Sequence, residues 1–137
     1  MRFFSLVKTL SRDSLIRLCH LDYDREMALV AVVPAPPSDD PEAPAEEIIG
    51  VVRYMLNPDL ETCEYAIVLA DAWQGKGLGR RLMTAIVDAA RRKGLRRVEG
   101  FVLANNGKML GMMRSLGFQD RMDPDDPSMR IVTLDLR

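Results

Sequence analysis

A glycine-rich segment constrains this chain more than any other feature. Gln74-Gly75-Lys76-Gly77-Leu78-Gly79 lies between an apolar run, Tyr65 to Ala70, and a segment of helical periodicity, Leu78 to Lys93. That order predicts a strand, a loop and a helix. Glycines let the backbone turn tightly and approach a ligand, while a helix N-terminus supplies free N–H groups and a partial positive charge. The segment therefore predicts an anion site, with phosphate as the expected anion.

The spacing of the glycines excludes two common phosphate-binding motifs. A P-loop needs Gly-x-x-x-x-Gly-Lys-Ser/Thr, and the dinucleotide fingerprint Gly-x-Gly-x-x-Gly fails because Arg80 stands at its last position. The segment instead fits Gln-x-x-Gly-x-Gly. From the loop alone, a glycine-rich turn that only tightens the corner between strand and helix remains an alternative.

The segments before the loop predict a helix and three strands. Ser11 to His20 has helical spacing and a capping serine, and Met27 to Val33 is rich in β-branched residues. Ile48 to Leu56 and Thr62 to Leu69 flank a turn signal, Asn57-Pro58-Asp59. The last two strands are expected to form an antiparallel hairpin.

The segments after the loop predict a βαβ unit and its continuation. The helix from Leu78 to Lys93 ends at Gly94, and Arg97 to Leu103 reads as a strand. A right-handed crossover makes this strand parallel to the one before the loop. We expect a short helix over Lys108 to Leu116 and a closing strand over Arg130 to Leu136. The long helix is predicted to bury one stripe, Leu78, Leu82, Ala85, Ile86 and Ala89.

Length and composition bound the domain organisation. With 137 residues, 47% of them apolar, residues 1–137 are expected to form a single domain with one core. Residues 34–47 contain five prolines and five acidic residues and no large apolar side chain. Such a composition does not support a packed element, so a mobile loop is predicted there.

The charge balance and apolar runs exclude several partners and compartments. Nineteen basic and twenty acidic residues give a net charge of −1, so no nucleic-acid partner is expected. No apolar run approaches the roughly 18 residues of a membrane span, and Met1 to Leu10 lacks the apolar core of a signal peptide. Cys19 and Cys63 form no motif. We expect a cytoplasmic protein with free thiols, no metal and no membrane partner.

A second motif indicates which protein family the loop pattern resembles. Asn106 stands eleven residues before Gly117-Phe118, across the predicted strand-to-helix turn. Together with Gln-x-x-Gly-x-Gly, this pattern resembles the GNAT superfamily of N-acetyltransferases, which bind acetyl-CoA at the loop between a central strand and the following helix. The resemblance implies that the expected phosphate is the pyrophosphate of acetyl-CoA, used as a cosubstrate.

Other stretches resemble, more narrowly, the GNAT domain of bacterial protein-lysine acetyltransferases of the Pat type. The likeness runs from Phe3 to Phe118 and is carried by Phe3-Phe4-Ser5, Asp22 to Val30, Glu64-Tyr65-Ala66, Trp73 to Gly79 and Met109-Leu110. It implies the GNAT fold, which is an α+β (mixed α/β) fold. A central, mostly antiparallel sheet would contain one parallel pair splayed at the acyl-CoA site, with helices on both faces. It also implies transfer of acetyl to a protein lysine, such as one of an acyl-CoA synthetase.

Two departures from the family pattern matter. The superfamily places a strand and a helix before the stretch that matches Phe3-Phe4-Ser5, and this chain begins almost at that point. We expect that it is a fragment of a longer chain; a neighbouring subunit in a homodimer is the alternative source of the strand. Many members also carry a tyrosine, proposed to protonate the leaving thiolate, seven residues after the motif asparagine. Here that residue is Met113, which has no proton to donate.

The resemblance assigns the catalytic base to Glu64, the position of a catalytic glutamate in Pat-type enzymes. A lysine ammonium must lose its proton before its nitrogen attacks, and a glutamate is too acidic for this unless burial raises its pKa. An exposed strand-end carboxylate is the alternative reading of Glu64. Glu61 and Cys63 are nearby alternatives, the thiol as a site of an acyl-enzyme. His20 is expected to cap the end of a helix.

The resemblance also assigns the acetyl-CoA contacts, most of them to backbone. The strand before the loop would pair with the pantetheine arm, and the loop amides would bind the pyrophosphate. Lys76, Arg80 and Arg81 would add positive charge, or would only form a solvated basic helix start. Asn106 would contact the CoA arm or fix its own turn. The expected cofactor-binding residues are Ile67, Val68, Leu69, Gln74, Gly75, Lys76, Gly77, Leu78, Gly79, Arg80 and Asn106.

Three readings of function stay open beside protein-lysine acetylation. The chain could acetylate a small-molecule amine, or it could sense acyl-CoA without turnover, which Met113 and the missing N-terminal elements favour. A pure interaction domain would bind no CoA at all. The identity of the acceptor is not encoded in the motifs.

Overall fold

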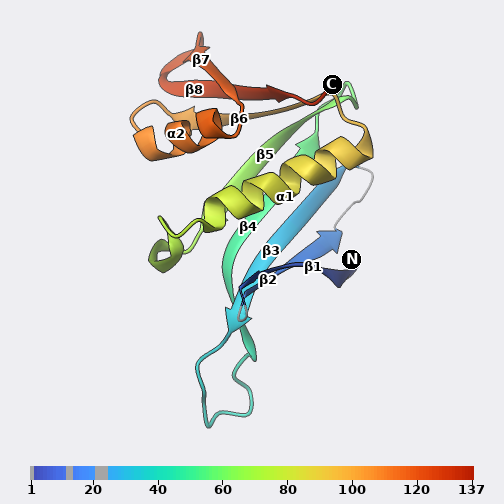
Figure 1. The fold of residues 1–137 in the computed structure, drawn as a ribbon, viewed down its shortest axis with the longest axis vertical. Helices are drawn as coiled ribbons and strands as arrows, with labels where there is room; N and C mark the ends of the chain where they lie inside the picture. The colour runs from blue at the N-terminus through green and yellow to red at the C-terminus, as the bar shows by residue number, and fades with distance from the viewer. Residues whose placement is uncertain (1, 12–13, 21–24) are drawn as a thin grey trace. The chain divides into compact units, whose positions relative to one another are not determined.

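The computed structural model describes residues 2–11, 14–20 and 25–137, with side chains from residue 25 onward. It divides into two compact units, which are described in turn (Figure 1). The first contains the residues up to 53 and residues 67–86, and the second contains residues 54–66 and 87–137. Strands β4 (Glu46–Leu56) and β5 (Thr62–Leu69) and helix α1 (Leu78–Lys93) contribute residues to both units.

The first unit contains strands in the order β1-β2-β3-β4. Strands β1 (Arg2–Ser11), β2 (Ser14–His20) and β3 (Glu26–Pro34) pair antiparallel. The expected helix over Ser11–His20 is therefore wrong, because residues 14–20 form β2. Leu15 of β2 pairs with Val32 of β3, so strand partners take up backbone groups that a helix would satisfy internally. Helical spacing over so short a segment did not foresee this pairing.

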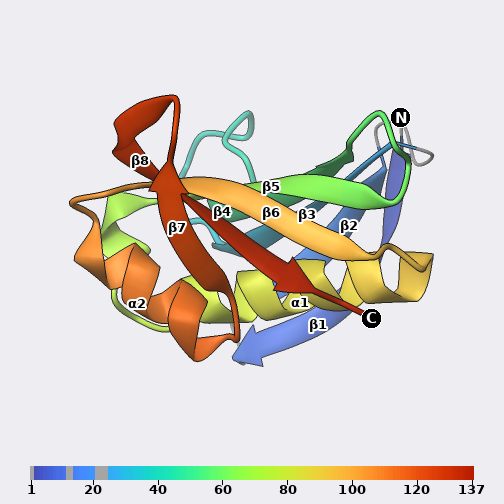
Figure 2. The same cartoon turned by 90° about the horizontal axis from the view of Figure 1, so that it is seen from above.

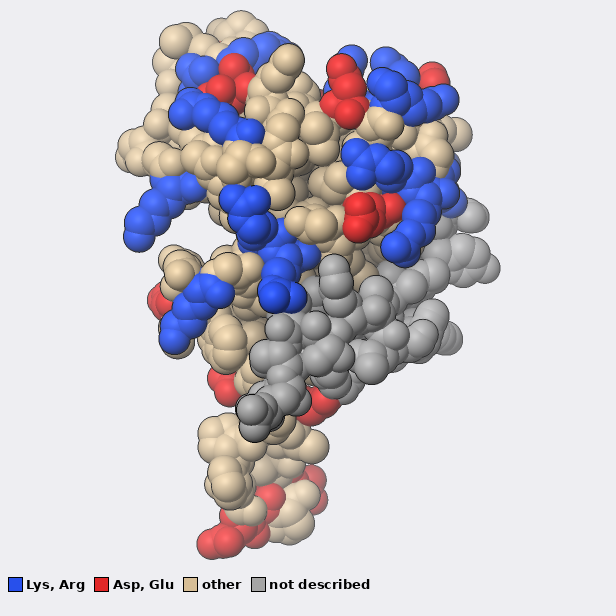
Figure 3. Space-filling model, viewed as in Figure 1, with Lys and Arg blue, Asp and Glu red and all other residues tan. Residues whose placement is uncertain are grey.

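The connection between β3 and β4 is a hairpin-like extension. The N–H of Ala35 donates to the carbonyl of Ala45 at 3.0 Å, which continues the pairing of the two strands. At the tip, the N–H of Ala43 donates to Asp40 O, and that of Glu42 to Asp40 Oδ1. Figure 3 shows the exposed carboxylates of this tip in red. The strands thus reach one or two residues into the expected loop, whose mobility stays a prediction.

Helix α1 packs in the first unit against a glycine of β4. A Cβ placed on Gly50 would lie 2.9 Å from Leu82 Cδ1 and 3.3 Å from Leu78 Cδ2, so only glycine leaves room for these side chains. The bounds of the helix are those predicted. The buried stripe differs in part: Leu78, Leu82 and Ile86 are buried as expected, but Ala85 and Ala89 are half-exposed. Their places in the stripe are taken by Met83, Val87 and Ala90.

The second unit contains β5, β6 (Arg97–Leu103), β8 (Asp126–Asp135) and β7 (Gln119–Asp123), in that order. Strand β5 runs parallel to β6 over Thr62–Glu64 and Arg97–Glu99, and β8 is antiparallel to β6 and β7. Helix α2 (Gly107–Ser115) lies beside the β7–β8 hairpin (Figure 2). The predicted mixed sheet with one parallel pair is confirmed. Strand β7 was not predicted.

The core of the second unit forms around Tyr65 of β5. Its ring lies over Gly100 of β6, where an added Cβ would be 2.7 Å from the ring atoms Cδ2 and Cζ. The ring makes an edge contact with Phe118, and its hydroxyl donates to Met113 Sδ at 3.4 Å. The carboxylate of Asp120 ties α2 to the hairpin, since it pairs with Arg114 at 2.8 Å and with Arg130 at 3.2 Å.

Candidate functional site

The glycine loop joins β5 to α1 within the first unit. A 3₁₀ turn over Asp71–Trp73 precedes Gln74, and Gly75 and Gly77 adopt φ values of 79° and 85°. These angles lie in the left-handed region that favours glycine. An added Cβ at either position would meet nothing within 4 Å, so the backbone conformation, and not crowding, requires glycine here.

The start of α1, which follows the loop, has the features of an anion site. Gly77 O accepts the N–H of Arg81 at 3.2 Å, the first bond of the helix repeat. The amides of Leu78 and Gly79 precede it, and helix geometry gives first-turn amides no carbonyl partner within the helix. No acidic residue stands in the first turn, whereas Arg80 and Arg81 are exposed there. The partial positive charge of the helix end is thus unopposed by a carboxylate of its own turn.

Side chains of the loop make two local contacts. The Lys76 ammonium lies 5.9 Å from the centre of the Trp73 ring, a cation–π distance. Gln74 is tied to Asp71 twice, through its backbone N–H at 3.3 Å and its side-chain amide at 3.4 Å. Trp73 thereby holds a positive charge at the edge of the loop.

The strand end that precedes the loop also belongs to the first unit. Ile67 and Leu69 are half-buried, whereas 70% of the Val68 surface is exposed. The N–H of Ala70, directly after the strand, donates to Ile49 O at 2.9 Å. Pairing of Ile67–Leu69 with a pantetheine arm stays a prediction.

Glu64, the expected base, lies in the second unit. Its side chain is exposed on the face of β5 opposite to that of Cys63 and Tyr65, because strand residues alternate between faces. The enclosure that the base requires is therefore not supplied by the described side chains around it. Glu99 of β6 stands directly beside Glu64 in the parallel register. Nothing in the sequence marks Glu99 as a site residue, since strand register is not visible in a single sequence.

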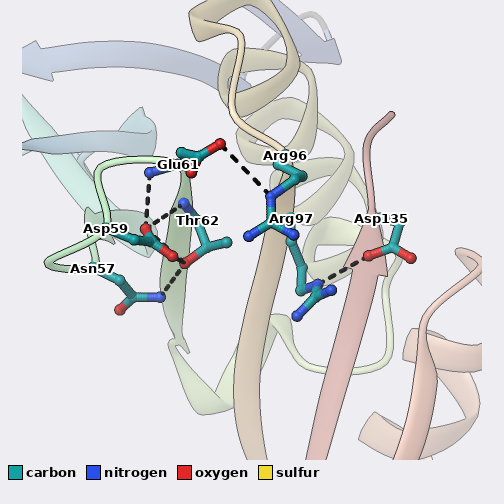
Figure 4. Close-up of polar contacts among 7 residues, drawn as sticks. All are labelled: Asn57, Asp59, Glu61, Thr62, Arg96, Arg97 and Asp135. Carbon is teal, nitrogen blue, oxygen red and sulfur yellow. Dashed lines mark hydrogen bonds and ion pairs between the residues drawn. The ribbon is translucent and has the colours of Figure 1, made fainter.

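The two alternatives to Glu64 fit the chemistry less well. Burial, and to a lesser extent the charge of Glu99, raise the pKa of the Cys63 thiol to about 12, so the thiolate needed for an acyl-enzyme is disfavoured. Glu61 is exposed and lies 3.9 Å from Arg96 (Figure 4). His20 lies among the residues whose side chains are not described.

The turn next to Glu61 is fixed by a polar network (Figure 4). Asp59 Oδ1 accepts the backbone N–H groups of Glu61 at 2.8 Å and Thr62 at 2.9 Å, which lower the pKa of Asp59. Asn57 Nδ2 donates to Thr62 Oγ1 at 2.7 Å and to Glu99 Oε1 at 3.3 Å. The network holds the start of β5 and the carboxylate of Glu99 in place.

Asn106 caps helix α2 in the second unit. Its Oδ1 accepts the N–H of Met109 at 3.1 Å, so the side chain satisfies an amide of the first turn. Of the two expected roles, fixing the turn is the one with a contact in the structure. Contact with the CoA arm stays a prediction.

Met113, in place of the family's tyrosine, is fully buried and accepts the Tyr65 hydroxyl. Burial raises the pKa of Tyr65 to about 12, so this phenol is a poorer acid than a free tyrosine. The sequence did not predict this contact. Alternation along β5 places Tyr65 on the inward face, but only the tertiary structure brings it to α2.

The expected site residues therefore fall into two groups. The first unit holds Ile67–Leu69 and the loop from Gln74 to Arg80, and the second holds Glu64 and Asn106. Within the part of the chain described, no three His, Cys, Asp or Glu side chains gather in a way that could hold a metal ion. None of the helices described is long and apolar enough to span a membrane.

Known proteins with sequences similar to this chain are acetyltransferases. Residues 11–118 match the model of the acetyltransferase (GNAT) family. Acetyltransferase PA5475 of Pseudomonas aeruginosa is 36% identical over 135 residues, which cover 98% of this chain and 69% of that protein. An L-methionine sulfoximine/L-methionine sulfone acetyltransferase of Pseudomonas paraeruginosa is 34% identical over 79 residues, 55% of this chain and 46% of that protein.

A solved structure shares the fold. The GNAT domain of S. lividans PAT superposes with a TM-score of 0.68 at 24% identity. The superposition covers 85% of this chain and 64% of that one.

Proposed function

Because the chain belongs to the GNAT family of acetyltransferases, which use acetyl-CoA, we propose that it transfers the acetyl group to the amine of a protein lysine. The observation that carries the proposal is the loop before α1. Gly75 and Gly77 take the left-handed conformation that turns the chain into a helix start free of acidic residues. An acyl-CoA synthetase is the protein substrate that the resemblance to Pat-type enzymes implies.

In the proposed complex, the pyrophosphate of acetyl-CoA binds the first-turn amides of Leu78 and Gly79. Lys76, held beside Trp73, adds positive charge at the loop. The pantetheine arm pairs with the backbone of Ile67–Leu69, and one amide there donates to the thioester carbonyl. Such a donor stabilises the oxyanion that forms during attack.

Glu64 is the proposed base, and we propose that acetyl-CoA and the acceptor, once bound, supply the enclosure that the described side chains do not. It takes a proton from the acceptor ammonium, directly or through a water molecule, and the free amine then attacks the thioester carbonyl carbon. The tetrahedral intermediate loses the second proton of its nitrogen to water and collapses with cleavage of the carbon–sulfur bond, and CoA leaves as a thiolate. Since residue 113 is a methionine buried against Tyr65, the thiolate takes its proton from water. A thiol pKa near 8 to 9 makes this exchange easy.

A small-molecule amine is the second candidate acceptor. The relative in Pseudomonas paraeruginosa is named for acetylating L-methionine sulfoximine and L-methionine sulfone, which are amino acids and not proteins. The match to this relative covers 79 residues, which are 55% of this chain. The two candidates share the acetyl-CoA site and the base and differ in what approaches Glu64.

Calorimetry and a thiol-release assay test the proposal together. Acetyl-CoA is expected to bind with heat, and lysine-containing protein substrates, including an acyl-CoA synthetase, are expected to release CoA. Glu64→Gln should retain acetyl-CoA binding and lose most turnover, typically 100-fold or more for a general base (roughly 10²–10⁴). Turnover with free amines but not with proteins would support the second candidate. Binding without any CoA release would show a sensor, and no binding would contradict the proposal altogether.

A further inference from the structure

The second unit has a sheet face that its own helix does not cover. Val98, Gly100 and Val102 of β6 point inward, where they are buried with Tyr65. The alternate residues, Glu99, Phe101 and Leu103, therefore point to the opposite side. We call this side the outer face. On it, 45% of Phe101 and 53% of Leu103 are exposed.

Strand β8 extends the apolar part of the outer face. Phe101 pairs in register with Ile131, and Leu103 with Met129. Directly paired residues of neighbouring strands point to the same side of a sheet, so both partners lie on the outer face. Ile131 and Met129 are half-buried. Two successive outward positions of β6 and their partners on β8 thus form a short apolar strip.

One end of the strip carries two carboxylates. Glu99 precedes Phe101 on the outer face, and its register partner on β5 is Glu64. Like charges directly opposite each other destabilise a sheet. Within the described part of the chain, neither carboxylate is in an ion pair; Arg97 on the same face pairs with Asp135 at 2.9 Å. Arg121 of β7, beside Ile131 in register, lies at the far side of the strip. A bound cation would reduce the repulsion between the two carboxylates.

Glu99 is also held in place. Its Oε1 accepts Asn57 Nδ2 at 3.3 Å, and the same amide nitrogen donates to Thr62 Oγ1 at 2.7 Å. A strand rises about 3.3 Å per residue, so the side chain of Phe101 begins about 7 Å from that of Glu99. A fixed carboxylate followed by exposed apolar groups matches a ligand that has an ammonium at one end and an apolar group a few bonds away.

We propose that the outer face binds the acetyl acceptor, with its amine at Glu64 and Glu99 and its apolar part on Phe101 and Leu103. This rests on the proposed function, because it takes Glu64 as the base. It narrows the acceptor class to primary amines joined through a short chain to an apolar group, which includes a protein lysine whose neighbouring residue is apolar. Polyamines fit less well, because a second ammonium over Leu103 and Met129 would be desolvated without a partner.

Two matched amines test the apolar part of the proposal. The acceptor 4-phenylbutylamine carries a ring that n-butylamine lacks, and its kcat/KM is expected to be about tenfold higher, as for contact with one apolar side chain. Phe101→Ser and Leu103→Ser should each bring this ratio toward one. Met122→Ser is the control: Met122 is 59% exposed on the same sheet but pairs with Arg130 on the inward side. It should leave the ratio unchanged.

Substitution of Glu99 by its uncharged isostere tests the carboxylate part. Glu99→Gln keeps an oxygen for Asn57 and removes the charge, so KM for both amines should rise about three- to tenfold while KM for acetyl-CoA stays unchanged. Asp125→Asn, at the exposed β7–β8 turn, removes one charge elsewhere and should change neither. A role of Glu99 in folding alone would alter both KM values or the unfolding midpoint instead.

Calorimetry of 4-phenylbutylamine on the CoA-loaded protein separates failure of this proposal from failure of the proposed function. Amine binding that Phe101→Ser weakens supports binding of the acceptor at the outer face, even if no acetyl group is transferred. Turnover of both amines at equal kcat/KM, or no effect of Phe101→Ser and Leu103→Ser, overturns it. So does a dimer in sedimentation that Phe101→Ser dissociates while amine binding is absent, since a second copy would then cover the face.

Discussion

Replacement of Gly77 by alanine tests whether the loop works through its backbone conformation. Gly77 has a φ of 85°, which costs a residue with a Cβ about 1–2 kcal/mol. An added Cβ meets no protein atom within 4 Å, so crowding within the protein adds nothing to this cost. The free loop can relax to a different conformation, and acetyl-CoA must then restore the strained one. The whole cost should therefore appear in the affinity for acetyl-CoA.

The expected magnitude is a Kd for acetyl-CoA that is about 5- to 30-fold higher in Gly77→Ala, since 1.4 kcal/mol is a factor of ten. Isothermal titration calorimetry measures it, and urea unfolding of the free protein should change by less than the binding energy does. Gly77→Asn is the matched control. Asparagine has a Cβ but enters the left-handed region readily, so its loss should stay under about fivefold.

Two results would refute the reasoning. If Gly77→Ala binds acetyl-CoA as tightly as the wild type, the conformation at Gly77 is not needed for the site. If the alanine and asparagine variants lose affinity equally, the Cβ itself crowds the ligand, and close approach rather than strain explains the glycine.

Three further predictions concern the second unit. Gly100→Ala should lower the free energy of unfolding by about 1–3 kcal/mol, because its Cβ would lie 2.7 Å from Tyr65 ring atoms. In the Tyr65→Leu background the same substitution should lower the free energy of unfolding, measured with urea, by less; an equal loss there would mean that the ring is not the obstacle. Asn106→Ala should cost about 1 kcal/mol through loss of the α2 cap, and Asn106→Asp should restore stability; a destabilised aspartate variant would argue against capping. The pKa of Cys63 is raised in the folded protein from 9.0 to about 12, so the contribution of this thiol to stability should be constant below pH 9 and fall as the pH rises toward 12. Between pH 9 and 10, below the usual range of the tyrosines, the free energy of unfolding should therefore fall less steeply with pH in Cys63→Ala than in the wild type, and equal slopes would contradict the burial of the thiol.

The sequence by itself determined the elements around the loop. The bounds of β5, α1 and β6 follow from periodicity and from Gly94, because repeats of 3.6 or 2 residues and helix caps are properties of near neighbours. The glycines at 75 and 77 were foreseen for the same reason. The paired motifs of the loop and Asn106 also indicated the family, since both are short local patterns that can be recognised without the fold.

Tertiary structure alone decided which residues meet. The segment from Ser14 to His20 is a strand because β3 lies beside it, and its helical spacing did not prevent this. The contact of Tyr65 with Gly100 and Met113, and the register that sets Glu99 beside Glu64, join residues 35 or more positions apart. Such pairings depend on hydrogen bonds between distant strands and on packing volume. A local pattern contains neither, so the outer face could be identified only from the fold.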